Sequence, residues 1–258
     1  MELPLQQHPT FGAALNRLGR DVRHVDLPGA APLQIIRRFG LTFAARGPVW
    51  SDKPDPHALR HTGPIILNAD HAGSLRTARY RMIMTPASVA EIDLRCAHSP
   101  HPKWRTSLRK TNAANLSIRI ERFSAKHQWL LDADLAQQNK KRYRALPHPL
   151  IHAFAAENPD HVTVFTALKK HEAIGAMLFL SHRPVTTYHI GWSNAVGRKH
   201  CAHHLLLNQA IARFAHQGFT RLDLGIVDTE NAPGLARFKI GSGAKVRTLG
   251  GTWLRCPI

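Results

Sequence analysis

The order of elements in the second half of the chain most constrains the fold. Three apolar, strand-like segments follow one another closely, at residues 162–168, 173–180 and 185–192. Consecutive strands with links this short form an antiparallel meander. A helix is expected over about residues 202–217, with Gly218 in the place of a left-handed C-cap, and a strand begins at Leu222. The order predicts an α+β fold in which helices flank a mixed, mostly antiparallel sheet.

The first half of the chain is predicted to be rich in strands. Helices are expected within residues 1–20 and 52–64, and strands over 22–27, 33–44 (two strands around Gly40), 65–68, 79–85 and 90–94. We therefore predict a β-rich N-terminal lobe over residues 1–125 and a C-terminal domain over residues 126–258. No segment repeats at a fixed period, which excludes a solenoid.

The net charge and the cysteine content indicate which partners and which cellular compartment suit this chain. The 258 residues include 35 Lys plus Arg against 17 Asp plus Glu, a formal net charge of +18. This excess favours polyanionic partners such as nucleic acid or an anionic membrane surface, although a solubilising surface charge explains it equally well. Three separated cysteines contain no CxxC pair, and no secretory leader or membrane-length apolar run is evident. We expect a cytoplasmic protein without stable membrane insertion, and peripheral membrane contact stays open.

A basic segment with a tryptophan occupies residues 101–110. On a helix, Trp104 and Leu108 share one face, and Arg105 and Arg109 stack on the adjacent face. Arginine suits phosphate, and the tryptophan could stack on a nucleic-acid base. The other interpretation is a surface helix whose tryptophan packs into the core. A second helix, expected from Asp132 to just before Pro147, carries further lysines and arginines, which form either a second basic stripe or a solvated face.

The loop before the helix at residue 202 has the composition of an anion site. Gly197, Arg198 and Lys199 precede a helix N-terminus, where free N–H groups and cations favour a phosphate. His200, His203 and His204 have metal-like spacing, but no carboxylate joins them and the chain has 18 histidines, so no metal site is expected. The chain contains no P-loop, no GxGxxG after a strand and no GxSxG elbow.

The C-terminal stretch LDLGIVDTENAPGLARFKIGSGAKVRTLGG, residues 222–251, carries the sharpest signal. A strand is followed by a polar loop at 228–234, by Phe238 and Lys239, and by a run of spaced glycines. An aromatic ring beside a cation, next to backbone that glycine leaves open, suits an anionic substrate or a developing oxyanion.

This stretch resembles the C-terminal motif of the Fem-type aminoacyltransferases and their relatives with a FemAB-like GNAT domain. In that family a strand ending Y/L-D-x-G leads through a loop to G-L-x-x-F-K-x-G-F-G-G. Gly234-Leu235 and Phe238-Lys239 match it, with Ser242 in place of the family's Phe. Residues 103–110 look like the family's K-x-R-x-x-I/L-R-K/R segment. Arg198 fits the first position of the GNAT coenzyme A loop R/Q-x-x-G-x-G/A, while Cys201 and His203 replace its small residues.

The resemblance implies a GNAT-like fold with a smaller, degenerate N-terminal GNAT-like lobe, and an N-acyltransferase. Fem-type enzymes take an aminoacyl group from aminoacyl-tRNA and add it to a peptidoglycan precursor. Relatives with the domain alone are generally taken as acyl-CoA-dependent acetyltransferases or other N-acyltransferases. No bound cofactor is expected; acyl-CoA or aminoacyl-tRNA would be the co-substrate and an amine the acceptor. The alternative is a non-catalytic RNA-binding module on a degenerate GNAT scaffold.

Within the acyltransferase hypothesis, the candidate residues take distinct roles. Lys239 would stabilise the oxyanion or a substrate phosphate, and Phe238 would shape the acyl pocket. Asp223 or Asp228 would accept the proton of the amine, with His189 as a weaker candidate. The expected substrate-binding residues are Trp192, His189, Arg237, Lys103, Arg105, Arg109 and Lys110. Those expected to hold the co-substrate are Gly197, Arg198 and Lys199. The plainer interpretation is that Lys239 forms a structural ion pair and that Phe238 and Trp192 belong to the core.

Overall fold

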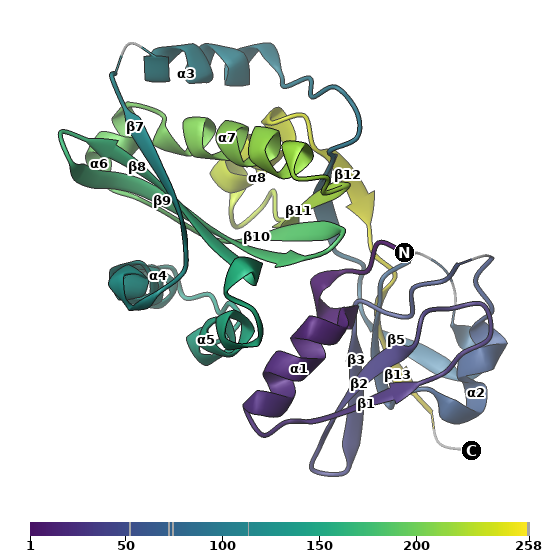
Figure 1. Cartoon of the computed structure of the whole chain (residues 1–258). Coiled ribbons are helices and arrows are strands. Elements are labelled where there is room, and N and C mark those ends of the chain that lie inside the picture. The colour runs from purple at the N-terminus through teal and green to yellow at the C-terminus, as the bar shows by residue number, and fades with distance from the viewer. Residues whose placement is uncertain (52, 72, 74, 113, 257–258) are drawn as a thin grey trace. The chain divides into compact units, whose positions relative to one another are not determined.

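The computed structural model describes residues 1–51, 53–71, 73, 75–112 and 114–256 (Figure 1). The chain divides into two compact units. Unit 1 comprises residues 1–89 and 246–258, and unit 2 comprises residues 90–245. The predicted division between residues 125 and 126 falls inside unit 2, just after a strand that pairs with residues 163–168.

Among the described residues of unit 1, six strands form one sheet in the order β1-β2-β3-β4-β13-β5. The strands are β1 (Asp21–Val25), β2 (Leu33–Arg38), β3 (Leu41–Ala45), β4 (Ile66–Ala69), β5 (Tyr80–Met84) and β13 (Gly251–Arg255). The helical segments are η1 (Leu5–Gln7), α1 (Pro9–Arg17), η2 (Pro56–Ala58), α2 (Leu59–Thr62) and η3 (Arg76–Ala78). The predicted β-rich character and the two strands around Gly40 agree with this arrangement.

The core of unit 1 forms on one face of this sheet. Leu33 and Ile35 of β2, Leu67 of β4 and Trp253 of β13 pack there with Leu59 of α2. Because β13 comes from the end of the chain and inserts between β4 and β5, the sheet depends on pairing across more than 180 residues. Local sequence patterns contain no signal for such a pairing.

A second sheet of seven strands, counted over the described residues, belongs mainly to unit 2, and its strands β6 and β12 cross the division between the units. Its order is β12-β6-β11-β10-β9-β8-β7. The strands are β6 (Ser88–Asp93), β7 (Ser117–Arg122), β8 (Val162–Lys169), β9 (Glu172–His182), β10 (Val185–Ser193), β11 (Arg221–Val227) and β12 (Lys245–Thr248). The helical segments are α3 (Pro102–Asn112), η4 (Ala125–His127), α4 (Gln128–Lys141), α5 (His148–Glu157), η5 (Pro159–His161), α6 (Ala195–Lys199), α7 (Ala202–His216) and α8 (Pro233–Gly241).

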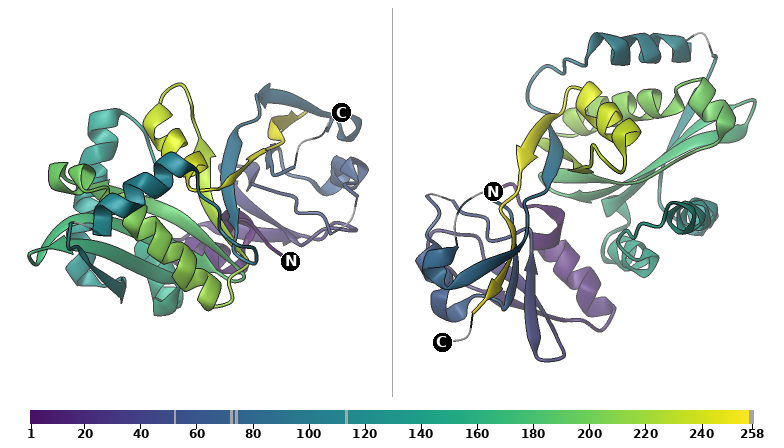
Figure 2. Two further views of the ribbon diagram at one scale, coloured as in Figure 1. Left: turned by 90° about the horizontal axis from the view of Figure 1, so that it is seen from above. Right: turned by 180° about the vertical axis from the view of Figure 1, so that it is seen from behind.

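Helices cover both faces of this second sheet. Figures 1 and 2 show α3, α7 and α8 over one face and α4 and α5 over the other. Strand β9 is therefore buried from Ile174 to His182 on both of its faces, which explains its nearly continuous apolar sequence. The predicted meander is present as β8, β9 and β10, paired antiparallel.

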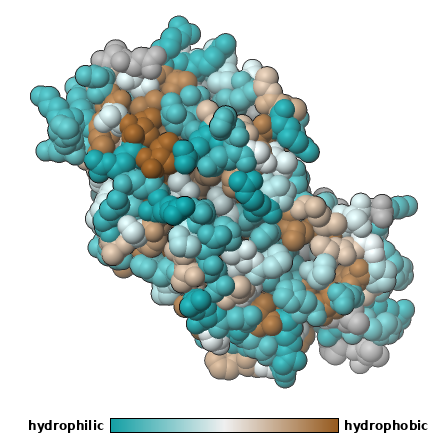
Figure 3. All heavy atoms as spheres, viewed as in Figure 1, coloured by the Kyte–Doolittle hydropathy of each residue, from teal (hydrophilic) through white to brown (hydrophobic). Residues whose placement is uncertain are grey.

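The face of the chain drawn in Figure 3 is mainly polar. Figure 3 shows hydrophilic side chains over most of one face, with hydrophobic side chains gathered near β7 and α7. There, Leu116, Ile118 and Ile120 pack against the core of unit 2. In the described part of the chain, every helix is too short or too polar to cross a bilayer.

Two strands of unit 2 separate after a short parallel pairing. Strand β10 pairs with β11 from Val185 opposite Arg221 to Thr187 opposite Asp223, and both strands continue beyond that point. The register of β10 against β9 then shifts between Tyr188 and Ile190, which makes His189 the extra residue of a β-bulge. Bulges of this kind redirect side chains, so the end of the β10–β11 pairing is where the sheet can present new groups.

Candidate active site

Lys239 lies against strand β11 just past the point where β10 stops pairing with it. Its side chain leaves α8, and its Nζ donates a hydrogen bond of 2.7 Å to the carbonyl oxygen of Ile226. The residue is 5% exposed. A Cβ built on Gly225 would lie 3.9 Å from Nζ, so the ammonium group lies beside a stretch of strand that has no side chain. A buried cation against open backbone is an arrangement that can stabilise negative charge on a substrate.

Burial changes the proton affinity of this lysine. Desolvation lowers the pKa of Lys239 from 10.5 to about 8, and the nearby carboxylate of Asp223 only partly opposes the change. At pH 7 the group is mainly protonated, and it loses its charge within an accessible pH range. Perturbed groups of this kind cluster at functional sites, although structural ion pairs produce them too.

Asp223 holds the strand beneath the lysine. It is 2% exposed, and its Oδ1 accepts a hydrogen bond of 2.7 Å from the backbone N–H of Gly225. Gly225 has a positive φ of 75°, which glycine adopts without strain. The carboxylate therefore fixes the backbone turn that leaves room for the Lys239 side chain.

Phe238 points away from Lys239, toward the helices. Its ring lies 5.2 Å from His204 and 6.1 Å from His203 on α7, and 6.2 Å from Trp104 on α3. Neighbouring residues of α8 thus serve two environments: Phe238 joins an aromatic cluster beneath α3, and Lys239 faces the strand. Of the glycine-spaced run that the sequence suggested as open backbone, Gly241 is helical, because α8 extends from Pro233 to Gly241, whereas Gly243, Gly250 and Gly251 follow outside this helix.

Trp104 belongs to the core, as the plainer interpretation of α3 held. It is 3% exposed, it contacts His204 at 5.0 Å between ring centroids, and a Cβ on Gly241 would lie 3.2 Å from its ring. A side chain buried this way offers no face to a nucleic-acid base. Of the two interpretations of this segment, base stacking by Trp104 is therefore wrong.

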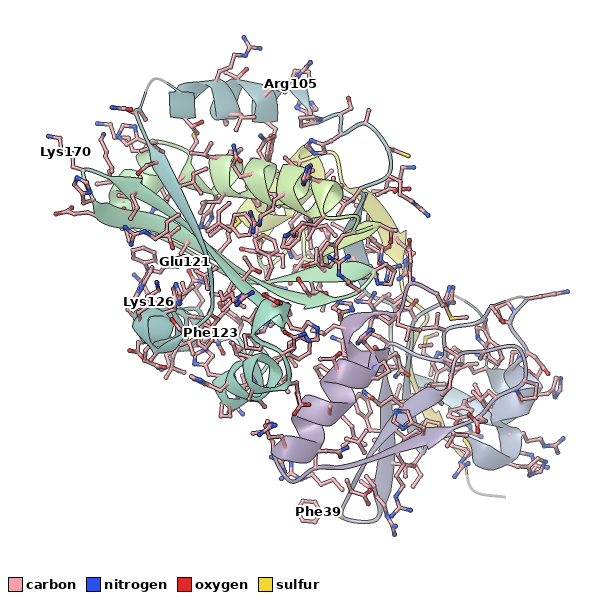
Figure 4. All side chains as sticks on the ribbon, viewed as in Figure 1. Phe39, Arg105, Glu121, Phe123, Lys126 and Lys170 are labelled. Atoms are coloured by element: carbon pink, nitrogen blue, oxygen red, sulfur yellow. The ribbon has the colours of Figure 1, made fainter. Side chains whose placement is uncertain are left out.

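The basic residues of α3 are exposed. Lys103, Arg105, Arg109 and Lys110 lie at the protein surface, and Figure 4 shows Arg105 on the outer side of the helix. The structure does not bring their charged groups to Lys239. Their expected role in gripping phosphate stays a prediction for an extended anion that runs over the surface.

Backbone N–H groups of the loop before α7 donate hydrogen bonds to acceptors within the loop itself. Asn194 caps α6 by accepting the N–H of Gly197 on its side chain (2.8 Å) and that of Arg198 on its carbonyl oxygen (3.0 Å). The N–H groups of His200 and Cys201 donate to carbonyl oxygens within the same loop. Of the three residues expected to hold the co-substrate, two have their N–H groups engaged in this way, and the third, Lys199, is exposed.

The side chains of this loop are also engaged or sterically fixed. The Arg198 guanidinium donates to the carbonyl oxygen of Ser193 at 2.7 Å. A Cβ on Gly197 would collide with the carbonyl oxygen of Ile174 in β9, which gives this glycine a packing function. His203 Nε2 donates to the carbonyl oxygen of Trp192 at 2.9 Å and so ties the start of α7 to the end of β10. These contacts leave little of the phosphate cradle that the sequence suggested.

His189 and Trp192 face the helices on the other side of the sheet. Burial lowers the pKa of His189 to about 4, with a smaller opposing effect from Asp134 on α4. No acceptor or donor among the described residues reaches its buried Nε2. The Trp192 ring packs edge-on against Trp129 of α4, with 5.2 Å between centroids. His189 is therefore a neutral imidazole at pH 7, held close to a second polar group.

That second group is a carboxylate–imidazole pair which the sequence did not reveal. Asp134 is 4% exposed, and its Oδ2 accepts hydrogen bonds from Gln138 (2.6 Å) and from His148 Nε2 (2.9 Å). A carboxylate that orients an imidazole in this way is a common arrangement for accepting a proton. His148 is 14 residues from Asp134, across the turn that joins α4 to α5, so only the apolar pattern around Asp134 hinted that its carboxylate faces inward.

The remaining predicted residues have local roles. Asp228 accepts the N–H groups of Glu230 (3.0 Å) and Asn231 (2.7 Å), and these hydrogen bonds lower its pKa. Asp228 is therefore a weaker base, and its carboxylate fixes the conformation of the loop before α8. Arg237 is exposed and donates to the carbonyl oxygen of Pro233.

The three clustered histidines have separate environments. His200 accepts from Lys169 Nζ (2.7 Å), His203 binds the backbone, and His204 contacts Trp104 and Phe238. Within the described ranges, no three His, Cys, Asp or Glu side chains are grouped as metal ligands would be.

Comparison with solved structures shows what this architecture is similar to. FemX matches with a TM-score of 0.71 at 11% identity, covering 98% of this chain and 96% of that chain. The C-terminal domain of a putative lysylphosphatidylglycerol synthetase from Agrobacterium fabrum matches at 0.60 and 14% identity, covering 98% and 89%. L-PGS from Bacillus licheniformis matches at 0.59 and 14% identity, covering 99% and 94%.

The sequence itself matches no protein-family model and no curated protein. At these identities the structural matches concern the fold. The predicted α+β, GNAT-like fold is confirmed: this chain has the fold of FemX and of the lysylphosphatidylglycerol synthetase domains.

Proposed function

We propose that the protein is an N-acyltransferase that moves an aminoacyl or acyl group onto an amine, with Lys239 stabilising the oxyanion. The observation that carries the proposal is the buried Lys239 ammonium at the end of the β10–β11 pairing. Among the described residues its one hydrogen-bond acceptor is the Ile226 carbonyl oxygen, which leaves two N–H groups for a ligand. The fold shared with FemX supports the transferase class.

The chemistry requires little beyond charge stabilisation and a proton acceptor. The amine nitrogen forms a bond to the carbonyl carbon of the donor, and the carbonyl oxygen takes the negative charge. When the carbon–oxygen bond of a donor ester breaks, the departing oxygen receives the proton that the amine loses. Removal of one preorganised oxyanion donor typically costs about 10²–10³ in rate, which is the contribution that we assign to Lys239.

Asp223 and Phe238 support this lysine in the proposal. Asp223 would position Nζ and preserve its charge, because its carboxylate raises the pKa that burial lowers. Phe238 would hold α8 against α3 and α7, so that Lys239 meets the substrate in a fixed position. The proton that the amine loses goes to the departing oxygen of the donor, because Asp228 is a weakened base and His189 and the Asp134–His148 pair face the helices on the other side of the sheet.

Of the two donors, we favour aminoacyl-tRNA over acyl-CoA. Coenzyme A needs free N–H groups to bind its pyrophosphate, whereas those of Gly197, Arg198, His200 and Cys201 already have acceptors within the loop. An aminoacyl-tRNA brings its phosphates along an extended backbone, for which the exposed cations of α3 are suited.

The test is to incubate the protein with charged tRNAs and, in parallel, with acyl-CoAs, each with small-molecule extract as acceptor. Mass spectrometry then identifies amides that carry the donor group. An aminoacylated amine formed by the wild-type protein and not by Lys239→Met supports the proposal. An acylated amine formed only from acyl-CoA supports the reaction and overturns our choice of donor.

The exposed basic residues of α3 and α4 favour one alternative, a non-catalytic RNA-binding module. Salt-dependent tRNA binding without any transfer, unchanged in Lys239→Met, would establish it.

A further inference from the structure

The tip of the β2–β3 hairpin in unit 1 presents an aromatic side chain to solvent. Phe39 is 89% exposed, and Figure 4 shows its ring at the outer end of the hairpin. Leu41, across the turn, is 52% exposed, and Arg37 and Arg38 beside them are exposed as well. Large apolar side chains that project singly are ordinary, but two at one tip, flanked by two cations, form a compact amphipathic feature.

The backbone of this turn is unsuited to phenylalanine. Arg38 pairs with Leu41, so the turn consists of Phe39 and Gly40, with positive φ values of 49° and 76°. Such two-residue turns favour Asn-Gly, because asparagine tolerates the left-handed conformation. A phenylalanine there is strained and gains no burial in return; within unit 1 its ring contacts the Arg38 guanidinium, 4.9 Å from the ring centroid. The aromatic ring therefore serves something other than the stability of the turn.

The same end of the sheet carries further arginines. Phe43 pairs with Ile66, Ile66 with Leu254, and Arg255 with Tyr80, so the start of β3, the end of β13 and the start of β5 lie at one end. The N–H of Cys256 donates to the carbonyl oxygen of Arg79, which joins the two segments there. A surface pocket of about 610 Å³ at this end is lined by Arg76, Arg79, Tyr80, Arg81, Met82 and Cys256.

We propose that this end of unit 1 docks on an anionic lipid surface. Phe39 and Leu41 would enter the boundary between headgroups and acyl chains, and the arginines of the hairpin and of the pocket would contact lipid phosphates. Aromatic rings favour that boundary, and arginines near an anionic leaflet are attracted to it. The surface would hold the protein at a membrane without a spanning helix.

Charge and side-chain chemistry favour a lipid partner over RNA. Arginines suit the phosphates of either partner, but the aliphatic Leu41 gains nothing from a nucleic-acid base, and Arg38 already occupies one face of the Phe39 ring. A lipid boundary accommodates both apolar side chains and needs no free ring face. The proposal is independent of acyl transfer by unit 2.

The experiment is co-sedimentation of the full chain with vesicles of phosphatidylcholine alone or with 30% phosphatidylglycerol. The wild-type protein is expected to partition onto the anionic vesicles. Phe39→Asn should lower the partition coefficient at least about tenfold, because it removes most of the buried apolar area. It should also raise the melting temperature by about 2–4 °C, because it relieves the turn.

Charge reversal tests the contribution of the hairpin arginines to membrane binding. Arg37→Glu with Arg38→Glu should lower binding to anionic vesicles about 30-fold or more, at roughly a factor of five for each basic residue near the surface. Two matched controls lie in unit 2: Leu135→Asn, at a 51% exposed leucine, and Lys140→Glu with Lys141→Glu. The leucine control should leave partitioning unchanged, and the charge control should lower it less than the hairpin variant does.

Several results would overturn the proposal. Wild-type protein that stays in solution with anionic vesicles would do so, and so would a Phe39→Asn variant that binds them as well as the wild type. Loss of binding to a single-stranded RNA oligonucleotide in Phe39→Asn, with vesicle binding intact, would assign the hairpin to RNA instead.

Discussion

The ammonium group of Lys239 and the carbonyl oxygen of Ile226 lie 2.7 Å apart, where β11 continues beyond its pairing with β10. This contact ties a buried cation to backbone, with the carboxylate of Asp223 nearby. The cation is thereby held in place before any substrate arrives, as electrostatic stabilisation of a transition state requires.

The first prediction concerns stability against pH. The pKa of Lys239 is about 8 in the folded chain and 10.5 when unfolded, so the unfolded state binds more protons between these values. The free energy of unfolding should therefore rise with pH from about 8 to 10.5, by up to about 3 kcal/mol relative to Lys239→Met. Denaturant titrations of both proteins at several pH values measure it. Parallel curves across this range would show that the lysine titrates normally.

The second prediction concerns rate against pH. An oxyanion-stabilising Lys239 must be charged, so the rate of transfer should fall as the pH rises through about 8. Single-turnover rates with a fixed donor, measured from pH 6 to 10, test this decrease in rate. A rate that stays flat to pH 10 contradicts a catalytic ammonium at this position.

The third prediction separates packing from cofactor binding at Gly197. Gly197→Ala places a methyl group against the carbonyl oxygen of Ile174 and should destabilise the chain by about 2–4 kcal/mol. Gly234→Ala is the control, because nothing lies within 4 Å of its Cβ position on α8; it should be neutral or stabilising by about 0.5–1 kcal/mol. Thermal unfolding measures both. A Gly197→Ala variant with native stability but weakened donor binding would restore a cofactor role.

The fourth prediction concerns acid sensitivity. Burial lowers the pKa of His204 to about 4, so the unfolded state binds the extra proton below about pH 6.5. Stability is lost as the pH falls from 6.5 to 4, and His204→Phe, which keeps a ring against Trp104 and Phe238, should remove about 2–3 kcal/mol of that loss. His216→Phe, at an exposed position of the same helix, serves as the control. Equal acid slopes in His204→Phe and wild type would contradict the assignment.

Local pattern sufficed for much of unit 2. The meander of β8, β9 and β10, the helix α7 and the strand β11 follow from apolar segments and turn residues that succeed one another along the chain. The boundaries of α4 could not be predicted from the local sequence pattern. It begins at Gln128 rather than Asp132 and ends at Lys141, because Arg142 adopts a left-handed conformation that the sequence did not mark.

The remaining parts of the fold and of the site could not be predicted, because they depend on contacts between segments that are far apart in the sequence. The insertion of β13 between β4 and β5, and the Asp134–His148 pair, depend on how elements pack rather than on neighbouring residues. Helix α8 did carry a local signal, since Pro233 suits a first helical turn, but the spaced glycines dominated the interpretation. The position of Lys239 against Ile226 could not be deduced from either residue alone.

The central claim is tested most directly by the amount of amide product formed in a single turnover by the wild-type protein and by Lys239→Met. Both are given the same aminoacyl-tRNA and amine, and circular dichroism verifies that both are folded. The rate should fall by about 10²–10³ in Lys239→Met while the variant keeps its fold and its affinity for the donor. A folded Lys239→Met protein that forms product at the wild-type rate would show that the lysine has only a structural role.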